Sequence, residues 1–453
     1  MQTLATSMAR FVVDLNLTIL PSEVAEKAKA CLLNAYGMGL NGYDTPYARV
    51  ARAAAVALDG EVAGGATLLG DGRRTTIGGA CLANSALFHG RAQEDTCGAA
   101  HFGTVLVPML TAMIEMRHYP MARLLPALVA GYEAGGLLEQ AYATRTTPGG
   151  FRSSAIYGTI AAAAAAGKLM GLEEPQVAAA LSNAVSFAGG VLQSFSDGTD
   201  EWRYQVGAVA RNGLLAAELA RAGSIAAPHA FEGRAGFIAS FARADGEVPG
   251  LADLLGREWA TLRVTFKPYP VCAFNQTPVT AALELRRELG DAAIRSIRVR
   301  MNPFETGYAG MDSTGPFNSI SGTLMSIPFC IATTLIHGVP DMRRMTTYND
   351  PAVNNLVNCV ELISDIAVPV LSAIIEVETT DGRWHRRDQR MTAANYAYNR
   401  PTVAALVRGI GVRQDLPSTA FDLLERFVEQ LPDSSIEDVL ASFAMLPAVS
   451  SVS

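Results

Sequence analysis

Residues Asn84–Leu110 read NSALFHGRAQEDTCGAAHFGTVLVPML and join two apolar, Ala-rich runs. The runs predict two buried helices, because unbroken apolar sequence with small residues is typical of helices packed on all sides. Between them lie His89, His101 and the adjacent acids Glu94 and Asp95. Titratable residues between two core helices suit a small-molecule site, although a plain polar loop joining two helices would look the same.

Composition excludes several classes of protein. The chain has 453 residues, 49% hydrophobic and 17% charged, which predicts an ordered protein with a large core and two domains. A net charge of -7 argues against nucleic acid or an anionic membrane as a main partner. The 6 cysteines lack CxxC spacing and the first residues lack a secretion signal. We therefore expect free thiols, no membrane span and a cytoplasmic location.

Hydrophobic periodicity changes along the chain. Residues 79–223 form one helical pattern after another, and the Ala161–Ala166 run would let helices approach closely. After Leu262 the patterns mix: strands are predicted at Ser296–Met301 and Ala373–Thr379, with a hairpin turn at Asp381-Gly382. Further helices are predicted at Thr277–Leu289, Met325–His337 and Pro351–Ile363.

These patterns predict a mainly α fold with an α+β part. We expect a large all-helical domain built from both chain ends, residues 1–265 and 405–453. A smaller α/β lid domain, residues 266–404, would be inserted into it. A cleft between the two domains is the expected place for a site.

The segment Thr265–Asn275, TFKPYPVCAFN, carries a second candidate site at the expected domain junction. Two prolines stiffen it, so Lys267 could present its ammonium to a carboxylate or, if desolvated, act as a base. Cys272 lies near a predicted helix start, which would favour a thiolate. The alternative is a surface lysine and a small core cysteine.

Two other segments offer binding groups. In Gly149–Gly158, GGFRSSAIYG, Arg152 could bind a carboxylate bidentately and Tyr157 could contact a substrate, or the segment could simply start a helix. Trp202 could form the wall of a pocket or belong to the core. No HExxH or carboxylate cluster with metal-ligand spacing occurs, so we expect no catalytic metal. The missing GxSxG motif disfavours a serine hydrolase of that fold.

The order of motifs resembles the MmgE/PrpD family over nearly the whole chain. The matching segments are Asn84–Thr96, His101–Pro108, Gly207–Gly213, Phe231–Phe237 and Lys267–Pro270. The Lys-Pro-Tyr-Pro run at Lys267–Pro270 is the most specific. The family includes methylcitrate dehydratase, cis-aconitate decarboxylase and iminodisuccinate epimerase. The resemblance implies a helical domain with an α/β lid, a homodimer, and catalysis without metal or organic cofactor.

The resemblance also implies which positions form the family's site, and at several of them this chain has a different residue. The retained residues are Thr96, His101 and Lys267. The replacements are Ala92 for an Asp, Arg152 for a His, Trp202 and Gln205 for a Lys and a His, Cys272 for a His, and Phe329 near the place of a Tyr. Such changes disfavour binding of a tricarboxylate in the family manner, because each lost donor leaves a charge less well paired.

We therefore expect a cofactor-independent lyase or isomerase that removes a proton from a small carboxylate or carbonyl compound, less acidic and more apolar than citrate. His101 would be the base or acid, Lys267 the anion holder and Cys272 a second acid or base. The expected substrate-binding residues are Thr96, Arg152, Tyr157, Trp202, Gln205 and Phe329. His89 and Asp95 would support the loop. The alternatives are a catalytically decayed binding or scaffold subunit and, less favoured, a thiol-dependent transferase using Cys272.

Overall fold

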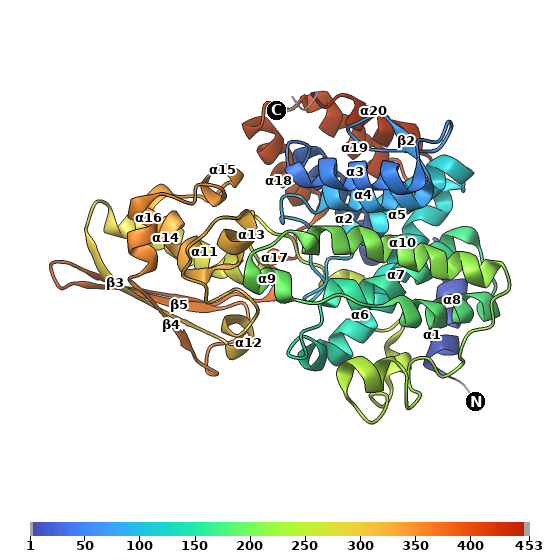
Figure 1. The fold of residues 1–453 in the computed structure, drawn as a ribbon, viewed down its shortest axis with the longest axis horizontal. Helices are drawn as coiled ribbons and strands as arrows, with labels where there is room; N and C mark the ends of the chain where they lie inside the picture. The colour runs from blue at the N-terminus through green and yellow to red at the C-terminus, as the bar shows by residue number, and fades with distance from the viewer. Residues whose placement is uncertain (1–2, 448–453) are drawn as a thin grey trace. The chain divides into compact units, whose positions relative to one another are not determined.

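The computed structural model describes residues 3–447, which divide into two compact units. Unit 1 comprises residues 3–191, 203–266 and 397–447, and unit 2 comprises residues 192–202 and 267–396. Helices build unit 1, and a small mixed sheet lies in unit 2 (Figure 1). The expected fold class, mainly α with an α+β part, is confirmed. The sequence patterns did not indicate that residues 192–202 belong with unit 2.

Unit 1 is built from helices that come from both ends of the described chain. They are α1 (Leu4–Asp14), α2 (Ser22–Asn41), α3 (Pro46–Asp59), α4 (Ile77–Phe88), α5 (Gly103–Arg117), α6 (Leu124–Thr146), α7 (Ser153–Met170), α8 (Glu174–Phe187), α10 (Glu201–Arg221, whose first two residues lie in unit 2), α18 (Arg400–Arg413), α19 (Ser418–Glu429) and α20 (Ile436–Ala444). A short ladder pairs β1 (Ala66–Thr67) with β2 (Arg74–Thr75).

Small residues bring the central helices of unit 1 close together. Every residue of Ala161–Ala166 on α7 is fully buried. A Cβ added at Gly213 of α10 would lie 2.3 Å from the Cβ of Ala162, and one at Gly135 of α6 would lie 2.9 Å from that of Ala161. Because only glycine fits at such approaches, these contacts confirm that the Ala-rich run permits close helix packing.

The stretch Asn84–Leu110 forms the end of α4, a loop and the start of α5. Both helices are buried almost throughout, as the apolar runs predicted. Thr76 accepts a hydrogen bond from the amide of Gly79 and so caps the start of α4. The polar loop, residues 89–102, is therefore held at both ends by helices of the core.

Unit 2 contains a four-stranded sheet in the order β4-β3-β5-β6. The strands are β3 (Ile294–Met301), β4 (Val360–Ser364), β5 (Ala373–Thr379) and β6 (Trp384–Gln389), and the helices are α9 (Gln193–Asp197), α11 (Gln276–Leu289), α12 (Pro303–Thr306), α13 (Ile320–Met325), α14 (Ile327–His337), α15 (Met342–Met345), α16 (Pro351–Val357) and α17 (Ala393–Tyr396). β3 pairs parallel with β4 and antiparallel with β5, which pairs antiparallel with β6. Helices α11 and α14 lie along one side of this sheet (Figure 1).

Most predicted elements of unit 2 are confirmed, and one is wrong. The predicted strands match β3 and β5, and Gly382 makes the hairpin turn with a φ of 84°. The helix predicted over Pro351–Ile363 ends at Val357, and the chain continues as β4. A parallel strand depends on pairing with β3 far away in the chain, which local periodicity does not report.

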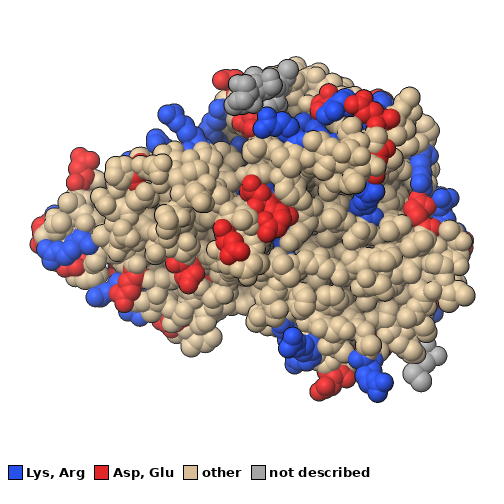
Figure 2. Space-filling model, viewed as in Figure 1, with Lys and Arg blue, Asp and Glu red and all other residues tan. Residues whose placement is uncertain are grey.

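The surface carries few charges for its size. On the face drawn in Figure 2, acidic and basic side chains are separated by broad uncharged areas, as expected from the low charged fraction. Within residues 3–447, no helix combines the length and the apolar character that crossing a bilayer requires.

Candidate active site

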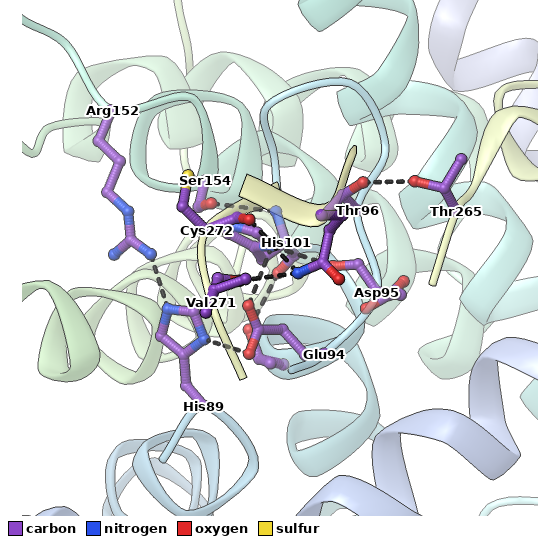
Figure 3. A network of polar contacts seen from close by, with 12 residues as sticks. His89, Glu94, Asp95, Thr96, His101, Arg152, Ser154, Thr265, Val271 and Cys272 are labelled. Carbon is purple, nitrogen blue, oxygen red and sulfur yellow. Dashed lines mark hydrogen bonds and ion pairs between the residues drawn. The ribbon is translucent and has the colours of Figure 1, made fainter. Parts of the chain in front are cut away.

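The loop between α4 and α5 places one carboxylate between two histidines (Figure 3). Glu94 Oε2 lies 3.2 Å from His89 Nδ1, and Glu94 Oε1 lies 3.2 Å from His101 Nδ1. The two imidazole rings are 5.4 Å apart, centroid to centroid. His89 and Glu94 are buried, whereas the side chain of His101 is 17% exposed. Of the two rings, His101 is therefore the one that solvent reaches.

The surroundings of His101 define which of its nitrogens is basic. Its backbone amide donates to Ser154 Oγ at 3.0 Å, and its Nδ1 lies 2.9 Å from the carbonyl oxygen of Asp95. Because a carbonyl oxygen only accepts, the neutral ring carries its proton on Nδ1 and its basic lone pair on Nε2. A carboxylate beside Nδ1 stabilises the imidazolium that forms when Nε2 takes a proton, which is the arrangement of a general base.

Asp95 holds the loop against the core. Its Oδ2 accepts a hydrogen bond from the hydroxyl of Tyr132. A Cβ added at Gly103, the first residue of α5, would lie 2.4 Å from Asp95 Oδ1. The carboxylate thus lies at the start of a helix, where its negative charge is favoured. Burial, then the charge of Asp95, raises the pKa of Tyr132, so this hydroxyl remains a donor. This geometry agrees with a supporting role for Asp95.

The Arg152 side chain makes polar contacts with two other side chains, those of His89 and Gln205. Its side chain is buried; one nitrogen lies 2.7 Å from His89 Nε2, and another donates to Gln205 Oε1 at 3.3 Å. Gln205 in turn donates from Nε2 to the carbonyl of Val191 at 3.2 Å. Two of the six positions expected to differ from the family pattern, Arg152 and Gln205, therefore contact each other. This arrangement suits Arg152 to organising the site more than to the predicted role of anion clamp.

Thr96 connects the loop to the chain segment before Lys267. Its amide and carbonyl form a two-way bridge with Thr265, both N–H···O distances being 2.8 Å. The two hydroxyl oxygens lie 2.7 Å apart. The structure thus assigns the Thr96 hydroxyl a protein partner, and its predicted role in substrate binding stays a prediction.

Ala92 has a left-handed backbone with a φ of 56°. This conformation is uncommon for residues other than glycine and is adopted more readily by Asn and Asp. Ala92 is also the position at which the resemblance implies an acid. The loop therefore has, at Ala92, a backbone shape that an aspartate tolerates better than alanine.

In unit 2, the stretch that follows Lys267 is organised by a side chain that the sequence did not single out. Gln276 Nε2 donates to the carbonyls of Tyr269 at 3.0 Å and Val271 at 3.1 Å, and its Oε1 accepts from the amide of Tyr269 at 3.1 Å. Lys267 itself is buried. The two prolines and this glutamine together give the stretch one backbone path, as the predicted stiffness requires.

Cys272 is a protonated thiol at neutral pH. Desolvation raises its pKa to about 11, and the amide of Phe274 and the charge of Lys267 offset this only in part. Of the two alternatives for Cys272, the raised pKa disfavours the thiolate. The side chain does not lie at the start of a regular helix but before a 3-10 turn, Ala273–Asn275, that leads into α11. Its proposed role as an acid is compatible with a protonated thiol.

Unit 2 also buries an acid that no sequence pattern indicated. Glu305 on α12 is fully buried, and its Oε1 accepts from the amide of Leu371 at 2.9 Å. Its Oε2 has no hydrogen-bond partner within the described residues. Burial raises the pKa of Glu305 to about 7. A lone glutamate in a Pro-Phe-Glu-Thr turn carries no motif, so only the fold reveals it.

The remaining predicted binding residues are buried within their own units. Tyr157 contacts the ring of Phe237 at 5.7 Å, and its hydroxyl is 2.7 Å from Thr146 Oγ1, which argues against a substrate-binding role. In unit 2, Trp202 Nε1 donates to Ser321 Oγ at 3.0 Å. Also in unit 2, the ring of Phe329 lies 4.9 Å from that of Phe317.

The described residues show no metal centre. In the part of the chain that the structure covers, residues 3–447, no group of three or more His, Cys, Asp or Glu side chains is arranged to hold a metal ion.

Comparison with known proteins gives three relatives named for one activity. The chain is 29% identical to a cis-aconitate decarboxylase-like protein of Aspergillus oryzae over 63% of this chain and 62% of the relative. It is 28% identical to cis-aconitate decarboxylase of Aspergillus terreus over 70% and 68%. Human cis-aconitate decarboxylase is 26% identical over 64% and 61%. The match thus spans less than two thirds of the first and third of these relatives.

Family models match most of the chain. The MmgE/PrpD N-terminal domain matches residues 6–247, and the MmgE/PrpD C-terminal domain matches residues 269–407. The first match contains the His89–Glu94–His101 cluster, and the second begins just after Lys267. The chain belongs to the MmgE/PrpD family.

Proposed function

We propose that the protein is a cofactor-independent lyase or isomerase that transfers a proton at a carbon next to a carboxylate or carbonyl group. The observation that carries the proposal is the pairing of His101 Nδ1 with the Asp95 carbonyl and the Glu94 carboxylate. This pairing presents Nε2 as a base and stabilises the charged ring that results. The names of the relatives support a lyase.

In the proposed reaction, His101 Nε2 takes a proton from the substrate carbon, and the bonding electron pair moves toward the neighbouring carbonyl or carboxylate oxygen. Lys267, two residues after Thr265 in the chain, would hold this oxygen and stabilise its negative charge. Loss of a leaving group from the next carbon, with the proton passed to that group by the charged His101, gives elimination. Transfer of the Cys272 thiol proton to the opposite face of the carbon gives epimerisation. In a decarboxylation, CO₂ leaves and the charged His101 supplies the proton that replaces it.

The substrate we propose is less acidic and more apolar than citrate. Arg152, which contacts His89, is already bonded to protein groups, so it is less available to a substrate carboxylate. Trp202 and Phe329 stand where the resemblance implies polar side chains. A mono- or dicarboxylate with an apolar part fits a site in which Arg152 is less available and more of the side chains are apolar.

The test is proton exchange in D₂O, followed by NMR, with a panel of small carboxylates that includes cis-aconitate. At least one compound should exchange a C–H proton or form a product. His101→Gln should lower kcat/KM by about 10²–10⁴-fold, since that is the usual contribution of a general base. Lys267→Met should cause a loss of similar or smaller size through the oxyanion it no longer stabilises.

His229→Gln is the matched control, because the His229 side chain is 57% exposed; it should leave kcat/KM unchanged. Near-normal activity in both site variants would contradict the assignment. Binding of a carboxylate, seen as a rise in Tm, without exchange or product would favour the decayed, binding-only alternative.

A further inference from the structure

Arg152 dictates the protonation of His89. A guanidinium offers only donors, and one of its nitrogens lies 2.7 Å from His89 Nε2. His89 Nε2 must therefore accept, so the ring is neutral and carries its proton on Nδ1. A charged His89 would direct a ring N–H at the guanidinium, which places two donors and two positive charges against each other.

The opposite side of the ring meets Glu94. The Nδ1 of His89 lies 3.2 Å from Glu94 Oε2, while the other carboxylate oxygen lies 3.2 Å from His101 Nδ1. One carboxylate, that of Glu94, thus lies within ion-pair distance of two histidines. If both rings could take a proton, they would compete for the same negative charge and titrate as a coupled pair.

We propose that Arg152 is a positioning residue that keeps His89 neutral, so that the charge of Glu94 supports only His101. The inference rests on the proposed function in one respect, the role of His101 as the base. It assigns Arg152 an action through His89 and Glu94, in place of the substrate contact expected from the sequence.

The neighbours of the cluster favour this assignment. Gln205 accepts from Arg152 at 3.3 Å and is itself anchored on the Val191 carbonyl, which fixes the guanidinium beside His89. Glu94 lies against Nδ1 of both rings, and Arg152 lies against His89 Nε2. Asp95 directs its carboxylate to Tyr132. Glu94 is therefore the carboxylate that pairs with His101 Nδ1.

The tautomer is measurable without a substrate. In protein labelled with ¹⁵N-histidine, long-range ¹H–¹⁵N spectra distinguish an Nδ1–H ring, an Nε2–H ring and a charged ring. His89→Gln and His101→Gln assign the two signals by their disappearance. In the wild type, His89 should be an Nδ1–H ring and stay neutral from pH 8 to about pH 5.5, below the usual histidine range. His101 should become charged over the same interval.

Arg152→Met tests the cause. Removing the donor should let His89 become charged, so that the first proton is shared between the rings and full charging of His101 requires a second step at lower pH. Arg211→Met is the control, because Arg211 pairs with Asp59, away from the cluster; it should leave both signals unchanged. An Nε2–H or charged His89 in the wild type would overturn the proposal, as would identical His89 titration in wild type and Arg152→Met.

A second substitution separates this role from simple structural support. His89→Gln supplies one acceptor for Arg152 and one donor for Glu94, so it should preserve the titration of His101. His89→Leu supplies neither and should alter it. If Arg152→Met does not fold, the wild-type tautomer and the His89 pair still decide the question. Failure of the D₂O exchange would reject the proposed function while leaving this protonation pattern intact, so the two failures are distinguishable.

Discussion

The loop of residues 89–102 in unit 1 and the surroundings of Cys272 in unit 2 have opposite effects on titratable side chains. The loop favours the charged form of His101, and the surroundings in unit 2 favour the protonated, neutral forms of Cys272 and Glu305. In the loop, the Glu94 carboxylate meets two imidazoles, and the Asp95 carbonyl directs the proton of His101 to Nδ1. In unit 2, desolvation raises the pKa of Cys272 to about 11 and that of Glu305 to about 7. At His101 the first region is therefore arranged to accept a proton, whereas Cys272 and Glu305 of the second retain theirs.

Burial raises the pKa of a carboxylate in each unit, Glu133 and Glu305, and the two differ in the number of donors that they meet. Within unit 1, the buried Glu133 accepts hydrogen bonds from the amides of Ala260 and Thr261 and from the Thr261 hydroxyl. Within unit 2, Glu305 Oε1 accepts from the backbone amide of Leu371, and Oε2 has no partner in the described residues. A buried carboxylate with few donors holds its proton, because the charged form loses more hydration than it regains.

The largest effect expected outside catalysis is the pH dependence caused by Glu305. Its folded pKa of about 7 exceeds the ordinary 4.5, so the folded state binds this proton more tightly. Stability is fully present below the ordinary pKa and falls as pH rises through the folded pKa. The loss should be about 3 kcal/mol. Urea unfolding between these pH values should show this slope in the wild type and lose it in Glu305→Gln.

Glu361→Gln is the matched control from the same unit, because the Glu361 side chain is 64% exposed. Its stability profile should follow that of the wild type. If the free energy of unfolding of Glu305→Gln has the same pH dependence as that of the wild type, Glu305 does not hold its proton in the folded state more tightly than an ordinary glutamate.

The next effect concerns Cys272. With a pKa of about 11 instead of 9.0, its thiolate population at neutral pH should be about a hundredfold below that of an ordinary thiol. Alkylation of Cys272 by iodoacetamide, followed by mass spectrometry, should therefore be slow at pH 7. The rate should rise about tenfold per pH unit up to roughly pH 10, since the thiolate is the nucleophile.

N-acetylcysteine under the same conditions provides the reference rate. Fast alkylation of Cys272 at pH 7 would reverse the assignment of unit 2 as the proton-retaining region. It would also restore the thiol-dependent transferase as a candidate.

The smallest expected effect is a loss of stability that tests how tightly the loop packs around Asp95. Gly103→Ala would place a Cβ 2.4 Å from Asp95 Oδ1, and the displaced carboxylate should destabilise the fold by about 1–3 kcal/mol. A drop in Tm measures this. Gly189→Ala is the control, because no atom lies within 4 Å of the added Cβ. Equal Tm values for the two variants would mean that the loop yields easily around Asp95.

Much of the fold was predictable because its signals are local. The alternation in Ser296–Met301 and the turn at Asp381-Gly382 predict β3 and the β5–β6 hairpin, and both are present. The strand Val360–Ser364 was not predicted, because it is short and pairs in parallel with β3, a contact remote in sequence. The grouping of residues 192–202 with unit 2 is likewise a tertiary property.

The candidate site was predictable in its residue types but not in its connections. The stretch containing His89, Glu94 and His101 was singled out from its composition, yet the placement of Glu94 between the rings depends on an irregular loop without periodicity. Arg152 was expected to bind substrate, and its contact with His89 joins residues 63 positions apart. Glu305 offered no signal in the sequence, because its character comes from burial.

The left-handed backbone of Ala92 bears on how this site can evolve. Holding an L-residue with a Cβ in this conformation costs about 1–2 kcal/mol, and Asp bears it better than alanine. Ala92→Asp would therefore place an acid in the loop without a change in its backbone path. The backbone of this loop thus suits an acid at a position where the sequence has alanine, so one substitution would add a carboxylate to the loop.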